Sequence, residues 1–407
     1  MVNTIDLFAG CGGLTEGFKQ SGHYNTIACI EWDKAPCDTL RYNLTKKWKY
    51  DDADKRVIQF DIQRTKELIN GWNDNKYGSS EGLDALIKKY GGTVDIIIGG
   101  PPCQAYSVAG RIRDKDGMKN DYRNYLFENY IEIVKYYMPK AFVFENVPGI
   151  LSARPGNGGQ LIIDTIKERF QKTGYTILND LSKAIIDFTE YGIPQKRSRI
   201  IILALRNDCF DNPEKLLDKF YNEILPTKKV EKIKTVRDAI SDLPVLLPLE
   251  SPIKVGNKTY SHSLPDDNFT VHNHTPRFSS KRDIEIFKLL TEDIETGRNE
   301  YVSTDALKQL YTKITGKTSN IHKYHVIRWD EPSNTIPAHL YKDGLRHIHP
   351  DSKQLRTITV REAARLQTFP DDYEFITGTA MDYKMIGNAV PPLFAKLLAE
   401  SIFKFIF

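Results

Sequence analysis

Cysteine is rare in this sequence, which has five among 407 residues, at positions 11, 29, 37, 103 and 209. Their number is odd, their spacing is irregular, and none forms a Cys-x-x-Cys pair. This pattern argues against a disulfide framework and against a structural zinc site. It fits the reducing cytoplasm, so we expect a cytoplasmic protein without a metal.

Long apolar runs and a strong charge of either sign are also missing. No stretch approaches the roughly 20 apolar residues that span a bilayer, and the start of the chain does not resemble a signal peptide. Lys and Arg exceed Asp and Glu by only 57 − 53 = 4, too little to indicate nucleic-acid binding by itself. With 40% hydrophobic and 27% charged residues, we expect an unprocessed, folded intracellular protein.

Short β-branched runs alternate with longer amphipathic stretches from the start of the chain to about residue 206. The runs read NTIDLFAG, NTIACIEWD, RVIQFD, VDIIIGG, AFVFENV and RIIILALR. Nearly continuous apolar strands separated by helices predict an α/β fold with a doubly wound, mostly parallel sheet. Ligands of such sheets bind beyond the carboxyl ends of the strands, where the polar residues of these runs fall.

The chain becomes irregular and rich in proline after Arg206, apart from a helical pattern near 279–295. Regular patterns return with an amphipathic helix over 359–369 and an apolar C-terminal helix. At this length two domains are a reasonable expectation. We predict a first domain over 1–206, a smaller inserted domain over 207–349, and a return to the first domain over 350–407.

A nucleotide-like site is predicted where the first three strands end. The first strand runs into the glycine-rich turn DLFAGCGG, where backbone N–H groups can approach a ligand. Glu31 ends the next strand about 20 residues later, placed for ribose hydroxyls, and Asp61 ends the third. These features indicate an adenosine-containing ligand but do not separate a dinucleotide from S-adenosylmethionine.

Cys103 follows two prolines at the end of an apolar run, in GGPPCQAYSV. A cysteine nucleophile needs fixed geometry and access, which a rigid turn at the mouth of a sheet provides, although most cysteines are simply small buried side chains. Glu145 ends the neighbouring strand in FENVPG, and QKRSR places Arg197 and Arg199 just before another. We expect the thiol, the carboxylate and both guanidiniums to converge on one pocket.

Seven motifs occur together in this chain: DLFAGCGGL, IEWD, GGPPCQAYS, FENVPG, QKRSRIIIL, REAARLQTFP and GNAVPP. In their order and separations the chain resembles, from end to end, a bacterial-type DNA (cytosine-5)-methyltransferase. The resemblance implies the S-adenosylmethionine-dependent methyltransferase fold, an inserted target-recognition domain and double-stranded DNA as substrate. It also implies a functional pairing with a restriction endonuclease, and we expect a monomer.

The resemblance assigns the catalytic roles. In this family a thiolate adds to carbon 6 of cytosine, carbon 5 attacks the methyl group of S-adenosylmethionine, and a base removes the carbon-5 proton before the thiol leaves. Cys103 would be that nucleophile. Glu145 would bind ring nitrogen 3 and the exocyclic amine. Arg199 would lie at the cytosine carbonyl oxygen, and Arg197 would order the site.

The same resemblance assigns the cofactor residues. It implies contacts to the turn, the ribose, the adenine and the methionine part from Phe8, Gly10, Gly12, Gly13, Glu31, Trp32, Asp61, Pro101, Asn388 and Val390. The chain departs from some members at Tyr106, where phenylalanine is frequent, and we expect little consequence.

Cytosine in a duplex must be flipped out before a thiol can reach carbon 6. The stretch 109–124 has glycines at 110 and 117 and four basic residues within 111–119, which suits a mobile lid over phosphates. Residues 306–329 hold five Lys or Arg, no acid and several aromatic side chains, which suits contacts to DNA. The pairs His272/His274 and His347/His349 lack further ligands at a spacing typical of a metal site.

Three alternative functions remain. A regulator that has lost catalysis would not need Cys103, Glu145 and Arg199 together. An RNA cytosine methyltransferase would share the chemistry, but the sizeable inserted domain favours duplex DNA. A nicotinamide dehydrogenase would share the glycine turn and Glu31 and leave the Pro-Pro-Cys sequence unexplained.

Overall fold

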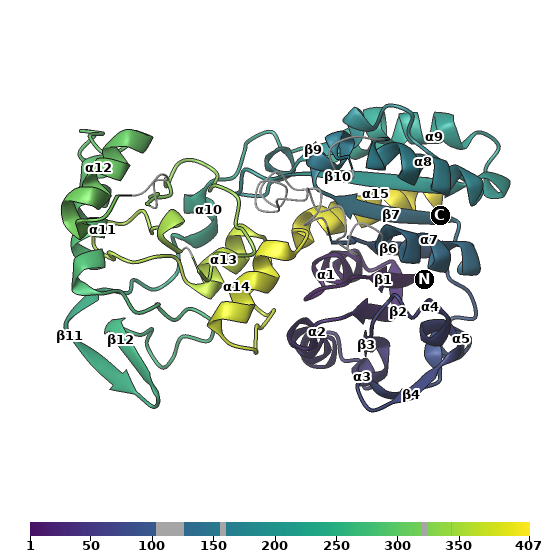
Figure 1. The fold of residues 1–407 in the computed structure, drawn as a ribbon, viewed down its shortest axis with the longest axis horizontal. Coiled ribbons are helices and arrows are strands. Elements are labelled where there is room, and N and C mark those ends of the chain that lie inside the picture. The colour runs from purple at the N-terminus through teal and green to yellow at the C-terminus, as the bar shows by residue number, and fades with distance from the viewer. Residues whose placement is uncertain (103–125, 155–159, 319–323, 343) are drawn as a thin grey trace. The chain divides into compact units, whose positions relative to one another are not determined.

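The structure is a computed structural model that describes residues 1–102, 126–154, 160–318, 324–342 and 344–407 (Figure 1). The chain forms two compact units. Unit 1 comprises Met1–Gly192, Arg197–Glu231 and Ala389–Phe407, and unit 2 comprises Ile193–Lys196 and Lys232–Asn388. Apart from the short segment Ile193–Lys196, the compact units therefore change over at 231/232 and 388/389. The sequence pattern suggests changes at 206/207 and 349/350.

Side-chain contacts explain both differences. After residue 206 the chain still packs on the sheet of unit 1, because the Tyr221 hydroxyl donates to the carbonyl of Ile201 and accepts from the N–H of Leu203. After residue 349 the chain still belongs to unit 2, where the Gln354 side chain accepts from the N–H of Leu246. The change from irregular to patterned sequence is therefore not the boundary between the compact units.

Unit 1 contains an eight-stranded sheet in the order β3-β2-β1-β6-β7-β10-β8, with β9 paired to β10. The pairings among β3, β2, β1, β6 and β7 are parallel, and those of β10 with β7, β8 and β9 are antiparallel. The strands are β1 (Val2–Leu7), β2 (Tyr24–Glu31), β3 (Val57–Gln59), β6 (Ile96–Gly99), β7 (Ala141–Asn146), β8 (Tyr175–Ile177), β9 (Ile185–Asp187) and β10 (Ser198–Arg206).

The expected α/β fold with a mostly parallel sheet is confirmed, and each of the six expected strands is present. β8 and β9, of three residues each, are not among the strands predicted from the sequence, and both are held by antiparallel pairing with β10. Central strands such as β6 are buried along their length, as is typical of parallel strands covered on both faces.

Helices pack against this sheet in two groups. On α7 and α8, Tyr130 and Phe170 make aromatic contacts with Phe142 and Phe144 of β7. On α15 the Ala399 carbonyl accepts from the Tyr24 hydroxyl of β2. The helices of unit 1 are α1 (Gly13–Gln20), α2 (Lys34–Lys46), α3 (Ala53–Arg56), α4 (Thr65–Asn70), α5 (Gly82–Tyr90), α7 (Leu126–Tyr137), α8 (Ile162–Lys172), α9 (Pro213–Lys219) and α15 (Pro392–Ile406). A small hairpin of β4 (Trp72–Asp74) and β5 (Gly78–Ser80) lies between α4 and α5 in the chain.

Unit 2 is mainly helical and irregular. Its elements are α10 (Val236–Ile240), the hairpin of β11 (Pro248–Val255) and β12 (Lys258–His262), α11 (Lys281–Glu295), α12 (Thr304–Thr315), α13 (Val360–Leu366) and α14 (Thr379–Asn388). Ser280 caps α11, and Thr359 with Glu362 forms a capping box on α13. α13 ends at Leu366, before the expected residue 369. The backbone of Thr368 has a φ of 63°, which is outside the α-helical range.

The apolar core of unit 2 lies around α11 and α12. It includes Ile286, Phe287, Leu290, Leu307, Leu310, Tyr324, Val326, Ile348 and Leu355.

In the part of the chain that the structure describes, no helix is long and apolar enough to cross a membrane.

Candidate active site

The glycine-rich turn between β1 and α1 has a backbone that most residues adopt only with strain. Phe8, Gly10 and Gly12 all have positive φ, of 61°, 56° and 83°. A Cβ on Gly13 would lie 2.3 Å from the carbonyl oxygen of Val390, so only glycine permits this close approach. The structure therefore brings the turn and Val390 together in unit 1.

Glu31 ends β2 beside this turn. Its Oε2 accepts from the N–H of Gly10 at 2.9 Å, and its Oε1 accepts from the N–H groups of Trp32 and Asp33 at 2.8 Å each. A carboxylate has about four acceptor positions, so the three amides leave about one for a further donor such as a ribose hydroxyl. Burial raises the pKa of Glu31, while the amide hydrogen bonds act to lower it.

The neighbouring residues suit an adenosine-containing ligand. Trp32 is 42% exposed directly after Glu31, so one large aromatic side chain faces solvent at the strand end. Asp61 follows β3, where its Oδ1 accepts from the N–H of Gln63 at 3.0 Å. Among the described residues, no atom lies within 4 Å of the place that a Cβ on Gly10 would occupy. The turn is thus open at Gly10, and the acceptors and aromatic surface fit a nucleoside with its hydroxyls and amine.

Glu145 and Arg199 form the second part of the site. Glu145 lies opposite Ile201 in the antiparallel pairing of β7 with β10, so Arg199, two residues earlier, is on the same face. The Nε of Arg199 lies 3.0 Å from Oε1 of Glu145, and these side chains are only 17% and 13% exposed. The expected convergence of this carboxylate and this guanidinium is seen in the structure.

The protonation of Glu145 depends on two opposing effects. Burial raises its pKa, and the positive charges of Arg199 and Arg197 act to lower it, with burial the larger effect. A raised pKa favours the protonated, proton-donating form of this carboxyl group more than in an exposed glutamate. Arg199 keeps this group oriented through the ion pair.

Arg197 is buried and held by unit 1. Its Nη2 donates to the carbonyl of Ala389 at 3.1 Å. Ala389 lies between two residues assigned to the cofactor, Asn388 and Val390. Asn388 is exposed at the end of α14, as the last residue of unit 2. Arg197 is therefore tied to the chain segment that follows α14.

The start of the Pro-Pro-Cys sequence is fixed to the strand that carries Glu145. The side-chain amide of Asn146 donates to the carbonyl of Pro101 at 3.2 Å, and Asn146 is buried. A Cβ on Gly100 would lie 2.4 Å from Oε2 of Glu145, so a larger residue there would displace this carboxylate. Cys103 and the stretch 109–124 lie outside the described residues.

Asn146, Gly100 and Ala389 are positioning residues that the sequence reasoning missed. Asn146 stands inside the motif FENVPG and Gly100 inside GGPPC, so both motifs already contained a signal. Asn146 lies 45 residues along the chain from its partner Pro101, and Ala389 lies 192 residues from its partner Arg197. No local pattern specifies such pairs.

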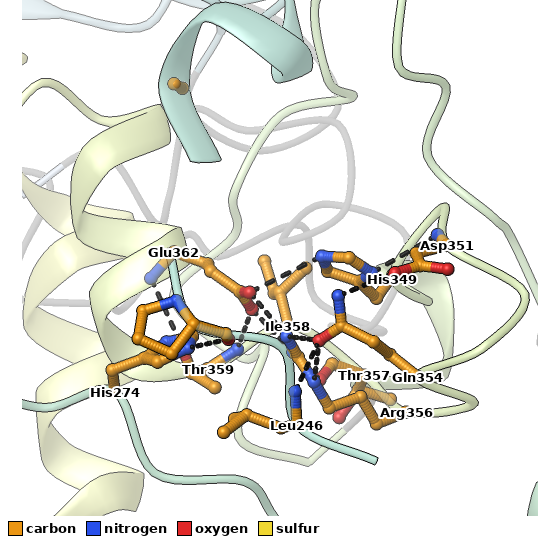
Figure 2. Close-up of polar contacts among 12 residues, drawn as sticks. Leu246, His274, His349, Asp351, Gln354, Arg356, Thr357, Ile358, Thr359 and Glu362 are labelled. Carbon is orange, nitrogen blue, oxygen red and sulfur yellow. Dashed lines mark hydrogen bonds and ion pairs between the residues drawn. The ribbon is translucent and has the colours of Figure 1, made fainter. Parts of the chain in front are cut away.

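Two of the histidines noted in the sequence belong to a buried polar network of unit 2 (Figure 2). The His349 Nε2 lies 3.5 Å from Oε1 of Glu362, which pairs with Arg356. Burial, with Arg356 beside it, lowers the pKa of His349 to about 3, so the ring is neutral at physiological pH. The His274 Nδ1 lies 3.1 Å from the hydroxyl of Thr359. These rings have structural partners.

The other two histidines do not form a metal site with them. His347 is buried, which lowers its pKa to about 3, and His272 lies 3.7 Å from Glu374. Within the described ranges, no three His, Cys, Asp or Glu side chains form a group that could hold a metal ion.

The chain is similar to known proteins in sequence and in fold. The profile of the family described as C-5 cytosine-specific DNA methylase matches residues 2–404. The Type II methyltransferase M.Bpa9945I of Bacillus paralicheniformis is 35% identical over 453 residues, covering 98% of each chain. M.DdeI of Desulfomicrobium norvegicum, also a Type II methyltransferase, is 34% identical over 424 residues, covering 98% of this chain and 88% of its own. A methyltransferase encoded within an E. coli prophage has a similar fold, with a TM-score of 0.61, 23% identity and coverage of 100% and 99%.

Proposed function

The chain belongs to the C-5 cytosine-specific DNA methylase family and is a DNA (cytosine-5)-methyltransferase; on this premise we propose that it methylates one cytosine within a specific double-stranded DNA sequence. The observation that carries the proposal is the ion pair of Glu145 and Arg199, which is mostly shielded from solvent at the strand end next to the Pro-Pro-Cys sequence. A carboxyl group with a raised pKa and a guanidinium suit the polar edge of a cytosine ring.

Cys103 is the nucleophile of this proposal. Its thiolate forms a bond to carbon 6 of a flipped-out cytosine, and the electron pair released makes carbon 5 nucleophilic. Carbon 5 then forms a bond to a methyl group, whose bond to the sulfonium sulfur of the donor breaks with the electron pair staying on that sulfur, so that a neutral thioether leaves. A base removes the carbon-5 proton, and the bond between Cys103 and carbon 6 breaks to restore the ring double bond and release the thiolate. The tie between Pro101 and Asn146 supports this role, because it fixes the chain two residues ahead of the thiol.

Glu145 and Arg199 stabilise the charge that enters the ring. Glu145 hydrogen-bonds to ring nitrogen 3 and the exocyclic amine, and Arg199 lies at the carbonyl oxygen. Arg199 also keeps Glu145 in one orientation through their ion pair. Arg197, held by the carbonyl of Ala389, orders the segment from which Arg199 projects.

S-adenosylmethionine, when bound, supplies the methyl group. The residues proposed to hold it at the turn and the ribose are Phe8, Gly10, Gly12, Gly13 and Glu31. Those proposed for the adenine and the methionine part are Trp32, Asp61, Pro101, Asn388 and Val390. The open space at Gly10 and the remaining acceptor position on Glu31 support this assignment.

Recognition of the DNA sequence is proposed for the inserted region over 207–349, most of which lies in unit 2. The basic and aromatic segment 306–329 is the proposed contact to DNA, and 109–124 is the proposed lid over the flipped base. The similarity to two Type II methyltransferases supports a role in a restriction–modification system, with a restriction endonuclease as functional partner. We further propose that the enzyme acts as a cytoplasmic monomer.

Bisulfite sequencing of host DNA after expression of this chain tests the proposal. We expect 5-methylcytosine at one short sequence, and none with Cys103→Ser or Glu145→Gln. DNA with 5-fluorocytosine at that site should trap the unaltered enzyme covalently but not Cys103→Ser. A matched control is Glu168→Gln, which removes an exposed acid of α8 in unit 1 and should leave the pattern unchanged. Retained methylation by Cys103→Ser would refute the covalent mechanism.

A further inference from the structure

Gln195 is a fully buried residue of the motif QKRSR to which the proposed mechanism gives no role. Its Oε1 accepts from the N–H of Ile336 at 2.9 Å. Its Nε2 donates to Oε1 of Gln367 and, at 3.4 Å, to the carbonyl of Leu366 at the end of α13. Both ends of this side-chain amide are therefore paired inside unit 2.

Gln367 extends the same network. It is also fully buried, and its Nε2 donates to the carbonyl of Ile386 on α14 at 3.0 Å. The two glutamine side chains thus link three parts of unit 2: the segment around Ile336, the end of α13, and α14. A buried amide left without partners is destabilising, so these bonds favour one arrangement.

The backbone on both sides of Gln195 is held in the same way. The N–H of Ser333 donates to the carbonyl of Pro194 at 2.9 Å, and the N–H of Lys196 donates to the carbonyl of Ser333 at 2.8 Å. The Thr335 hydroxyl donates to the carbonyl of Lys196 at 2.5 Å. Unit 2 therefore holds the chain on both sides of Gln195, up to the residue before Arg197.

The next residues carry the arginines of the proposed active site. At Arg197 the chain returns to unit 1, where its guanidinium meets the carbonyl of Ala389. Two residues later Arg199 pairs with Glu145. Only one residue, Lys196, separates the side chain anchored in unit 2 from the first arginine anchored in unit 1. A displacement of Gln195 consequently also displaces Arg197, which is only two residues further along the chain.

We propose that Gln195, paired with Gln367, is a positioning residue that sets where the chain enters the catalytic segment, and so controls the placement of Arg197 and Arg199. This inference rests on the proposed function of Arg199 and Glu145. It gives the buried glutamine pair a role in the rate of methyl transfer and not only in the stability of unit 2. Small misplacements of catalytic groups reduce rates by about 100-fold per ångström.

Gln195→Met tests the proposal, since methionine keeps the length of the side chain and removes the amide. We expect kcat for methyl transfer to fall about 10- to 100-fold, with KM values for DNA and S-adenosylmethionine within about threefold of those of the unaltered enzyme. Gln367→Met should show a similar loss. The double variant should be no slower than the slower single variant, because both substitutions break one shared bond.

Gln354→Met is the matched control. Gln354 is another buried glutamine of unit 2, and its side-chain hydrogen bonds join it to Leu246, Asp351 and Arg356, none of which belongs to 193–199. We expect this variant to lower the stability of unit 2 while its kcat stays unchanged at a temperature where it is folded. An equal loss of kcat in Gln354→Met and Gln195→Met would overturn the proposal, since the loss would then follow stability alone.

Hydrogen exchange provides a readout that does not require activity. Amides in a peptide covering 193–201 should exchange faster in Gln195→Met than in the unaltered enzyme, and should exchange normally in Gln354→Met. Unchanged exchange in Gln195→Met would overturn the positioning role. If the unaltered enzyme methylates no cytosine while the exchange result holds, the proposed function fails and the anchoring of this segment stands.

Discussion

Replacement of Glu362 by glutamine should destabilise unit 2 more than any exposed Glu→Gln change in the same unit. Glu362 and Arg356 form a bidentate pair, with Nη1–Oε2 and Nη2–Oε1 distances of 2.7 and 2.6 Å, and each side chain is 1% exposed (Figure 2). The Oε2 of Glu362 also accepts from the N–H of Thr359, which caps α13. The neutral amide in Glu362→Gln would leave a buried guanidinium without its counter-charge.

The expected cost follows from this burial. Removal of one member of a buried ion pair typically costs about 3–5 kcal/mol, because the remaining charge stays desolvated. Gln354 accepts two hydrogen bonds from Arg356 and would stabilise part of that charge, so we expect a loss of about 3 kcal/mol. The pKa of Glu362 is held far below its ordinary value by Arg356 and His349 against the effect of burial. The stabilisation is therefore complete above the unfolded-state pKa of about 4.3 and is lost only as the pH falls below it.

Urea unfolding followed by tryptophan fluorescence measures this change within unit 2. Of the four tryptophans, only Trp329 is in unit 2, and its ring meets His349 edge-on at a centroid distance of 5.4 Å. A Trp329→Phe background reports the transition of unit 1 alone. Glu292→Gln, which breaks an exposed pair with Lys288 on α11, should cost less than about 0.5 kcal/mol.

Two results would refute this reasoning. One is a loss in Glu362→Gln no larger than that in Glu292→Gln. The other is an equal shift of the unit 1 transition in the Trp329→Phe background. The double variant Arg356→Met/Glu362→Met should be more stable than the sum of its two single variants predicts, because no unpaired charge remains.

Three further predictions concern unit 1 and the unit boundaries. Burial raises the pKa of Asp6 to about 7, so the folded state loses stability as the pH rises toward that value and the buried carboxyl ionises. The free energy of unfolding of Asp6→Asn, measured in urea relative to the unaltered chain, should therefore rise by about 2–3 kcal/mol between pH 5 and 8. A difference that stays constant over this pH range would contradict the prediction. Asp61→Ala should weaken S-adenosylmethionine binding by about 1–3 kcal/mol in calorimetry; unchanged affinity would remove Asp61 from the site. Exchange of 232–388 for the same region of a relative should redirect methylation to the relative's DNA sequence, as read by bisulfite sequencing. Exchange of 207–349 should instead lower stability, because it cuts through both compact units. If the 232–388 exchange kept the original specificity, recognition would lie elsewhere in the chain.

Much of unit 1 could be predicted from the sequence. The six apolar runs became strands, and the polar residues that end them, such as Glu31 and Glu145, lie at carboxyl ends in the parallel part of the sheet. Helix starts were also local: Thr359 and Glu362 form their capping box three residues apart. These features depend on residues that are close in the chain, so their patterns are visible without the fold.

The boundaries of the compact units and the short strands could not be predicted in the same way. Residues 207–231 look like part of the irregular region, yet Tyr221 belongs to unit 1 through its bonds to β10. β8 and β9 are three residues long and exist as strands because β10 offers them a hydrogen-bonding edge. Such pairing depends on residues distant in the chain, which a local sequence pattern does not specify.

The sequence by itself determined the family, the α/β class and the motifs that contain the candidate catalytic residues. Only the tertiary structure decided which side chains meet: Arg199 with Glu145 across antiparallel strands, and Gln195 with Gln367, 172 residues apart. The physical reason is that strand and helix patterns arise from neighbours within a few residues, whereas a buried amide or ion pair forms only where the folded chain brings distant partners together and excludes water.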